Sequence, residues 1–367
     1  MRIGFHQEGN PIRIGSKDNK CFFIIATSIC FPLSAFIFPV SAYASGEIVG
    51  WGAGQRGQSG DHDRGQCIVP EPNMGFTAIA AGGVFSLGLK RDGSILAWGD
   101  NYSGQCNVPA PNMGFVAIAA GNAHSLGLKQ DGSIVAWGYN YSGQCNVPLP
   151  NTGFRAIAAG GGSSLGLKQD GSIVAWGYNG NGECNVPLPN TGFKTIATGG
   201  HSLGLKTDGS IVAWGYNYYG ECNVPSPNTG FIAISAGWYH SLGLKADGSI
   251  VAWGDNYDGD CDVPSPNTGF VAIAAGFRHS LGIKQDGSIV AWGLNASGQC
   301  TVPEPNMGFT AIAAGEHHSL GLKGCLYNLA GDLNDDCKVD MLDFATMADN
   351  WLVDCFEDSS NPACVHK

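Results

Sequence analysis

The sequence is poor in charge, and above all in positive charge. Of its 367 residues, 19 are Lys or Arg and 30 are Asp or Glu, so charged residues make up 13% of the chain. An acidic surface repels the phosphate backbone of nucleic acid, which is therefore excluded as a partner. Glycine is abundant, with 56 residues, and this composition favours many short strands joined by turns over long helices.

A long uncharged apolar run stands near the start, at residues 21–40. Basic residues precede it, and the small-residue site Ala42-Tyr43-Ala44 follows. This order is typical of an export signal, residues 1–44, cut after Ala44. A retained membrane anchor is the alternative, because the run is about long enough to span a bilayer. Cleavage removes four basic and two acidic residues, which leaves 15 against 28 on a protein expected to be secreted or attached to the cell surface.

Most of the remaining chain repeats one unit. Trp-Gly pairs recur at intervals of 47, 39, 39, 38, 39 and 39 residues, at Trp51, Trp98, Trp137, Trp176, Trp214, Trp253 and Trp292. A constant period near forty indicates an array of equal structural units. In one unit, residues 115–120, 124–129 and 133–137 read as strands, and Asp131-Gly132 supplies a hairpin turn. Each unit is therefore predicted to be a three-stranded antiparallel meander.

The count of half-repeats predicts that the array closes into a ring. The F-x-A-I-A half occurs seven times, and the Trp-Gly half also occurs seven times but starts first, at Glu47–Gly52. The last unit, residues 308–323, lacks a Trp-Gly half after it. If the opening strand completes this last unit, no strand edge is left unpaired. We expect an all-β, seven-bladed propeller over residues 45–323, with the Ala-rich strand nearest the axis.

The unit G-x-x-H-S-L-G-L-K-x-D-G-S-I-V-A-W-G-x-N-x-x-G-Q resembles the repeat of the regulator of chromosome condensation family, whose fold is a seven-bladed propeller. The short period and the Val-Pro ending of each unit are more similar to the propeller-type β-lactamase inhibitor proteins. The resemblance covers residues 46–323. It implies a fold used mainly to display loops, which specifies no activity.

Two residue types recur at fixed positions, His in five of the seven units and Cys in all seven, and invite a chemical interpretation. His124, His201, His240, His279 and His318 share one position, but catalysis or metal binding needs ligands gathered at one point. We interpret them as structural hydrogen-bonding residues. Seven cysteines follow the third strands, from Cys67 to Cys300. Outer strands of adjacent blades lie farther apart than the about 7 Å that a disulfide spans, so we expect buried, reduced thiols.

Variable loop positions are the candidates for binding a partner, because the fold does not dictate them. After the first strand, the fifth and sixth repeats carry bulky residues where the others carry mostly small or polar ones. Exposed aromatics with an Arg are typical of an interface hot spot. In the similar inhibitors, aromatic residues of these loops hold the partner. The alternative is ordinary aromatic packing within blades. The predicted partner-binding residues are Trp238, Tyr239, Phe277, Arg278, Tyr216, Tyr218, Tyr219 and Tyr257.

The last segment, residues 324–367, breaks the repeat. Its residues 331–353 place oxygen ligands at the spacing of a calcium loop, followed by a predicted helix, and this stretch resembles one half of a type I dockerin. The resemblance implies docking onto a cohesin-like partner, although Cys337 replaces the usual Gly and the second half is missing. An acidic linker is the alternative. Cys325, Cys337, Cys355 and Cys364 allow three disulfide pairings. The predicted Ca²⁺ ligands are Asp332, Asn334, Asp336, the Lys338 carbonyl, Asp340 and Asp343.

The sequence favours a binding module over an enzyme. It shows no nucleophile–base pair and no metal cluster outside the tail, so no catalytic residue is assigned. The predicted partner is an extracellular or cell-surface protein. The alternative function is a carbohydrate-binding or polysaccharide-processing component, for which the acidic loop Asp255–Asp262 is the candidate. A solvated acidic face is our preferred interpretation of that loop.

Overall fold

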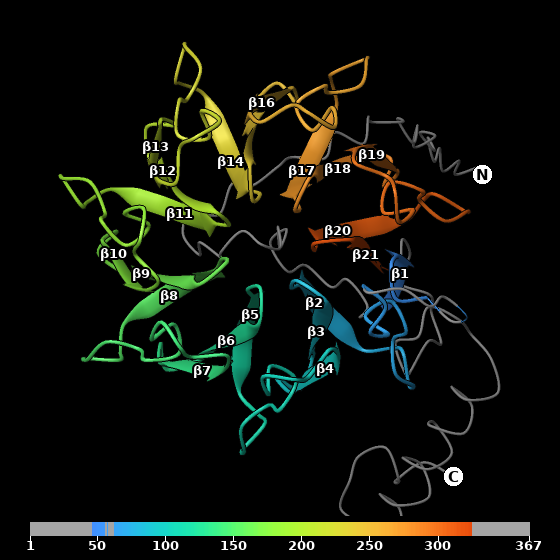
Figure 1. The fold of residues 1–367 in the computed structure, drawn as a ribbon, viewed down its shortest axis with the longest axis horizontal. Coiled ribbons are helices and arrows are strands. Elements are labelled where there is room, and N and C mark those ends of the chain that lie inside the picture. The colour runs from blue at the N-terminus through green and yellow to red at the C-terminus, as the bar shows by residue number, and fades with distance from the viewer. Residues whose placement is uncertain (1–45, 56, 58–61, 325–367) are drawn as a thin grey trace, which may run out of the picture.

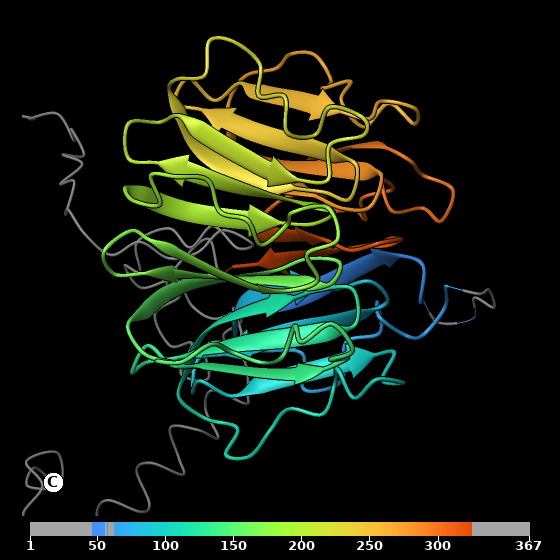
Figure 2. The same ribbon diagram turned by 60° about the vertical axis from the view of Figure 1, so that its left-hand side comes forward.

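A computed structural model describes residues 46–55, 57 and 62–324. They form seven three-stranded antiparallel sheets set as blades around a central axis (Figure 1). The second strand of each blade is the middle one, and the strands cross the thickness of the ring with loops at both ends (Figure 2). This is the all-β propeller that the repeat predicts. Within the described ranges, every regular element is a strand.

Blades 1 to 7 are numbered by their first strands. The first strands are β2 Phe76–Ala81, β5 Phe115–Ala120, β8 Phe154–Ala159, β11 Phe193–Thr198, β14 Phe231–Ala236, β17 Phe270–Ala275 and β20 Phe309–Ala314. The second strands are β3 Phe85–Lys90, β6 His124–Lys129, β9 Ser163–Lys168, β12 His201–Lys206, β15 His240–Lys245, β18 His279–Lys284 and β21 His318–Lys323. The third strands are β4 Ile95–Gly99, β7 Ile134–Gly138, β10 Ile173–Gly177, β13 Ile211–Gly215, β16 Ile250–Gly254, β19 Ile289–Gly293 and, for blade 7, β1 Glu47–Gly52.

The first strand of the chain closes the ring. β1 pairs with β21, and Trp51 lies opposite Ser319 in the register that Trp98 and Ser86 adopt in blade 1. The closure predicted from the half-repeat count is therefore confirmed. It leaves blade 7 with three strands, like every other blade.

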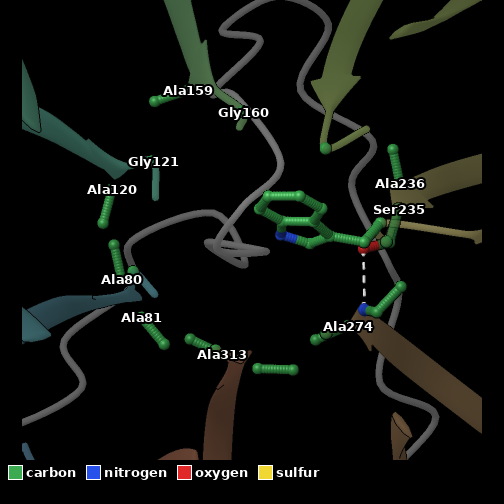
Figure 3. A pocket seen from close by; sticks show the side chains of 18 of the residues that line it. Ala80, Ala81, Ala120, Gly121, Ala159, Gly160, Ser235, Ala236, Ala274 and Ala313 are labelled. Carbon is green, nitrogen blue, oxygen red and sulfur yellow. Dashed lines mark hydrogen bonds between the residues drawn. The ribbon is translucent and has the colours of Figure 1, made fainter. Parts of the chain in front are cut away.

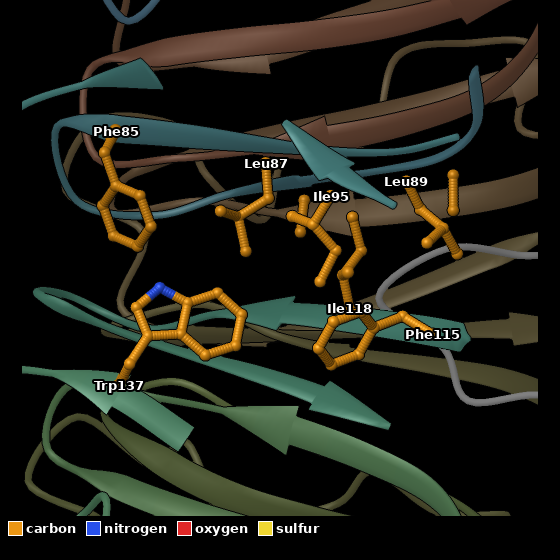
Figure 4. Packing of buried hydrophobic residues seen from close by; sticks show 9 residues of the cluster. Phe85, Leu87, Leu89, Ile95, Phe115, Ile118 and Trp137 are labelled. Atoms are coloured by element: carbon orange, nitrogen blue, oxygen red, sulfur yellow. The ribbon is translucent and has the colours of Figure 1, made fainter. Parts of the chain in front are cut away.

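Apolar cores lie between blades. Phe85, Leu87 and Leu89 of blade 1 pack against Phe115 and Trp137 of blade 2 (Figure 4). Alanines at the ends of the first strands surround the central axis (Figure 3). Small side chains suit the axis, where the blades converge. A single blade leaves these apolar surfaces exposed, so stability depends on the neighbouring blades.

One backbone carbonyl per blade joins it to the next. The Gln105 carbonyl of the loop after β4 accepts hydrogen bonds from the Ser125 hydroxyl (2.9 Å) and the Trp137 indole N–H (2.8 Å) of blade 2. The same pair of bonds forms at all seven junctions, with acceptor carbonyls at Gln66, Gln105, Gln144, Glu183, Glu221, Asp260 and Gln299.

The repeated histidines extend this junction. His124 Nε2 lies 3.0 Å from the Ser164 hydroxyl of the next blade, and His318 reaches Ser86 across the closure at 3.1 Å. Because each Ser gives its proton to the carbonyl, the His Nε2 must be the donor to the Ser oxygen. Burial lowers the pKa of His124 to about 4 and that of His318 to about 3, so these rings are neutral near pH 7. The structural role predicted for them is confirmed.

The seven blade cysteines are free thiols, as predicted, but they are half-buried rather than fully buried. Each thiol donates to a backbone carbonyl of its own loop, as Cys145 does to the Tyr139 carbonyl at 3.3 Å. Burial raises the pKa of Cys145 to about 11, and a protonated thiol is a poor nucleophile.

Three expectations lie outside the described residues: the export signal, the calcium loop with its helix, and the disulfides of the tail. No helix able to cross a membrane is found within the described part of the chain.

Ring closure can be tested with two matched tryptophans. Trp51 of β1 and Trp137 of β7 are both buried and occupy equivalent positions. Replacing either by Ala should lower the free energy of unfolding by a similar amount, about 3 to 5 kcal/mol. Denaturant unfolding of both variants measures this. A Trp51→Ala variant as stable as the wild type, beside a destabilised Trp137→Ala variant, would contradict closure by β1.

Candidate functional site

Both variable loops of a blade emerge at one end of the ring, which we call the loop face. The loop after the third strand hydrogen-bonds to the loop after the first strand of the same blade. In blade 5, the Asp255 N–H donates to the Tyr239 carbonyl at 2.8 Å, and in blade 6 the Leu294 N–H donates to the Arg278 carbonyl at 2.7 Å. Residues about 16 positions apart in the sequence therefore share one surface.

An aromatic cluster occupies this face over blades 5 and 6. The ring centroids of Trp238 and Phe277 are 5.4 Å apart, those of Tyr239 and Phe277 are 5.3 Å apart, and those of Trp238 and Tyr239 are 6.4 Å apart. All three side chains are half-buried. Such tilted and edge-on contacts fix the orientation of each ring, so the cluster is ordered before any partner arrives.

Blade 4 extends the cluster. The Tyr219 ring contacts Tyr239 edge-on at 5.7 Å, and Tyr216 contacts it at 6.4 Å. Tyr218 packs on Tyr219 and keeps 79% of its surface exposed. On the other side, Tyr257 is 85% exposed. The structure thus gathers the eight predicted partner-binding residues into one surface, and their packing runs across blades 4 to 6 as well as within blades 4 and 5.

Arg278 is not a free cation. Its guanidinium forms ion pairs with Asp255 and Asp258, each at 3.0 Å, and lies over the rings of Tyr239 at 4.8 Å and Tyr257 at 5.8 Å. No pattern in the sequence predicts these ion pairs. They hold the side chain in place, and they neutralise part of the acidic loop.

Asp260 departs from the expected solvated acidic loop, because it is fully buried and neither carboxylate oxygen has a hydrogen-bond partner. Burial, reinforced by Asp258, raises its pKa to about 7, although Arg278 acts in the opposite direction. Four other blades carry Gln here, and the Gln105 side chain accepts the Ser103 N–H at 2.9 Å. Asp260 is one methylene shorter than Gln, and its carboxylate does not reach the equivalent N–H, that of Asp258.

A cleft that the sequence interpretation missed lies beside the cluster, over blades 2 to 5. Its volume is about 400 Å³. Tyr139, Tyr178, Tyr216, Trp238 and Tyr239 line it, together with polar residues that include Gln144, Asn181 and Glu183. The available signal was the pair of side-chain-free loops, Gly161-Gly162 and Gly199-Gly200. A smaller cavity of about 100 Å³ follows the axis and is lined mostly by Ala and Gly (Figure 3).

Within the described residues, no group of three or more His, Cys, Asp or Glu side chains could hold a metal ion.

Comparison with known proteins identifies the repeat. The model of the Regulator of chromosome condensation (RCC1) repeat matches residues 76–105, 115–144, 154–183, 197–221, 231–260 and 270–299. The comparison with curated proteins found no match.

Solved structures share the fold. Prp20p of Saccharomyces cerevisiae is 18% identical, with a TM-score of 0.65 over 85% of this chain and 96% of that one. Human WBSCR16 is 17% identical, with a TM-score of 0.57 over 77% and 99%. The CRINKLY ectodomain of the Arabidopsis thaliana receptor kinase ACR4 is 24% identical, with a TM-score of 0.54 over 66% and 90%.

The raised pKa of Asp260 predicts that the free energy of unfolding depends on pH. Its folded pKa of about 7 lies above an unfolded value near 4. The stability that this carboxyl contributes is therefore fully present below about pH 4 and is lost progressively as the pH rises from about 4 to about 7. Asp260→Gln removes the titration and supplies the longer acceptor. It should raise the free energy of unfolding by about 1 kcal/mol or more at pH 8, and by less at pH 5.

Urea unfolding at both pH values measures the effect. Asp262→Asn is the control, because Asp262 is exposed in the same loop and most other blades carry Asn there. An Asp260→Gln gain that is equal at pH 5 and pH 8 would contradict the raised pKa.

Proposed function

We propose that this propeller of RCC1-type repeats is a protein-binding module whose partner contacts the loop face over blades 4 to 6. Trp238, Tyr239, Phe277 and Arg278 form the centre of the proposed contact, and Tyr216, Tyr218, Tyr219 and Tyr257 surround it. The observation that carries the proposal is the continuous aromatic cluster at positions where blades 1 to 4 carry only Gly, Val, Asn or Ala.

A binding surface whose side chains are already ordered loses little conformational entropy when a partner binds. Aromatic and Arg side chains dominate the affinity of most interfaces. Ring contacts fix Trp238, Tyr239 and Phe277, and two ion pairs fix Arg278. The cluster thus offers a rigid apolar surface with an exposed polar rim, the usual composition of a binding face.

Relatives of the same fold bind proteins. The structure of Prp20p is described together with its binding properties to Gsp1p and histones, and a second structure shows yeast RCC1 (Prp20) bound to Kap60. These partners belong to those proteins and do not identify the partner here. The variable loops differ between repeats of this one chain, so specificity resides in residues that the fold leaves free.

We place the module outside the cell or on its surface, on the basis of the signal-like residues 1–44. The partner is then an extracellular or cell-surface protein. Residues 324–367 are proposed to bind Ca²⁺ and to serve attachment, with a cohesin-like protein as a second partner. The low content of Lys and Arg argues against nucleic acid.

The competing function, a carbohydrate-processing component, would require carboxylates free to act on a substrate. The candidate loop offers only the exposed Asp262 and no pair of carboxylates, since Asp255 and Asp258 pair with Arg278 and Asp260 is buried. We therefore propose a module without catalytic activity.

Partner binding can be tested by replacing Trp238 and Phe277 singly with Asn, the residue that blade 2 carries at this position as Asn122. A tagged protein captures candidate partners from the native envelope, and affinity is then measured with the purified partner. Each variant should bind about thirtyfold more weakly, because losing a central contact costs about 2 kcal/mol. The melting temperature should fall only slightly, since Asn fits this loop in blade 2.

Leu188→Ala is the control, because Leu188 is equally apolar, 89% exposed, and adjacent to Pro189, whose carbonyl accepts Lys206 at the opposite end of the ring. It should bind the partner as the wild type does. Variants at Trp238 and Phe277 that keep full affinity would place the binding surface elsewhere.

The calcium proposal is tested on the full chain by calorimetry. Asp332→Ala combined with Asp336→Ala removes two anionic ligands and should abolish calcium binding. Glu357→Ala combined with Asp358→Ala, which lies outside the loop, should leave it intact. Absence of binding heat in the wild-type protein would refute the proposal.

A further inference from the structure

The cleft over blades 2 to 5 exists because two loops carry no side chains. Blade 3 carries Gly161-Gly162, and blade 4, whose loop is one residue shorter, carries Gly200 alone, where blades 5 and 6 carry Trp238-Tyr239 and Phe277-Arg278. A Cβ on Gly200 would lie 2.2 Å from the Trp238 carbonyl oxygen, and one on Gly162 would lie 3.0 Å from the Tyr178 Cβ. A Cβ on Gly161 would already touch the Trp238 ring at 3.5 Å. The backbone of Trp238 therefore leaves no room for a side chain at Gly200, and Tyr178 leaves little at Gly162, whereas the Trp238 ring would make only an ordinary van der Waals contact at Gly161. The space above these glycines stays open.

Aromatic residues form the walls of this cleft. Tyr139, Tyr178 and Tyr216 are the first residues after Trp-Gly in blades 2, 3 and 4, where blades 1, 5 and 6 carry Asp, Asp and Leu. Trp238 and Tyr239 are the other aromatic residues that line the cleft. Tyr139 and Tyr178 are each close to half exposed, so a ligand in the cleft would meet aromatic surface on several sides.

A buried carboxylate lies in the same lining. Glu183 is 4% exposed, and both of its oxygens are held by Asn181, through the side-chain amide at 2.7 Å and the backbone N–H at 2.9 Å. In blade 2, the neutral Gln144 accepts the equivalent backbone bond from Ser142 at 2.9 Å. The loop therefore does not need a charge at this position, and Glu183 adds one.

The electrostatic surroundings of the cleft are negative. Among the described residues that line it there is no Lys or Arg. Glu221, at the matching position of blade 4, is also buried, and its Oε1 has no hydrogen-bond partner. A neutral ligand could only donate hydrogen bonds to these carboxylates, whereas a cation gains in addition from the charge of the carboxylate and from the faces of the rings.

We infer that this cleft binds a cationic group, namely the Lys or Arg side chain of a protein partner held on the loop face. The inference rests on the proposed function, because Trp238 and Tyr239 belong both to the cleft and to the aromatic cluster. The cleft adds selectivity to that contact. It restricts the partner to proteins that present a basic residue beside the apolar surface covering Trp238 and Phe277.

The test uses small probes and the full-length protein. N-acetyl-lysinamide and N-acetyl-argininamide are titrated by NMR beside N-acetyl-norleucinamide, which has a similar apolar side chain without charge. The two cationic probes should shift resonances of Tyr139, Tyr178 and Trp238, and norleucinamide should not. Glu183→Gln, which installs the residue of four other blades, should weaken binding of the cationic probes about tenfold.

Two further variants separate the cleft from general effects. Glu304→Gln removes the same charge from an exposed residue in the connection between blades 6 and 7 and should change nothing. Tyr178→Leu, which copies Leu294 of blade 6, removes one aromatic wall and should also weaken the cationic probes. Cationic probes bound no better than norleucinamide, or bound equally by Glu183→Gln and the wild type, would overturn the inference.

Alternative ligands give distinct results. Tight binding of choline without binding of either amino-acid derivative would overturn the assignment to a partner side chain and point to a small ammonium compound. Binding of a neutral oligosaccharide that Glu183→Gln leaves unchanged would overturn it in favour of a sugar. The probes bind without a partner, so this titration tests the cleft alone. The partner affinity of the Trp238 and Phe277 variants tests the proposed function separately, and either experiment can fail without the other.

Discussion

A backbone carbonyl that accepts two hydrogen bonds from the next blade is the constraint on which this ring depends. At each junction a Ser hydroxyl and a Trp indole converge on this oxygen, and at five junctions a neutral His donates to the same Ser. The Nδ1 atom of each of these histidines has no hydrogen-bond partner among the residues that the structure describes. The carbonyl, the hydroxyl and the indole are buried, so leaving any of them unpaired would be costly. A blade can satisfy them only beside its neighbours, and the last blade can do so only if the ring closes.

Two of the seven junctions show how far this network tolerates substitution. Phe85 replaces the His of blade 1, so Ser125 keeps only its bond to the Gln105 carbonyl. In blade 3, Ser163 replaces His and reaches Ser202 through the Thr198 hydroxyl, with steps of 3.2 Å each. The carbonyl bonds persist in both cases. The His–Ser contact therefore reinforces a junction that the backbone already defines.

The same constraint explains why the loop face can vary. Since the acceptor is a backbone oxygen, the junction does not depend on the side chain of that residue. This side chain is Gln, Glu or Asp in different blades. This freedom allows Glu183 in the cleft, the buried Glu221 in the next blade and the buried Asp260 within the acidic loop. The side chains of the loop residues after each first strand also take no part in the junction, so they can vary between blades. Bulk in blades 5 and 6 then produces the aromatic cluster, and its absence in blades 3 and 4 produces the cleft.

The sequence by itself determined the strands, the seven blades, the closure by Glu47–Gly52 and the structural role of the repeated histidines. These features follow from the repeat, because equivalent residues occupy equivalent places in every blade. It also indicated which loop residues are free of the fold. Tertiary structure alone decided that Arg278 pairs with Asp255 and Asp258, that Asp260 is buried, and that Gly161 lies beneath Trp238. These contacts join residues that are not equivalent in the repeat. Their distances depend on how the ring angles one blade against the next, which no periodic pattern records.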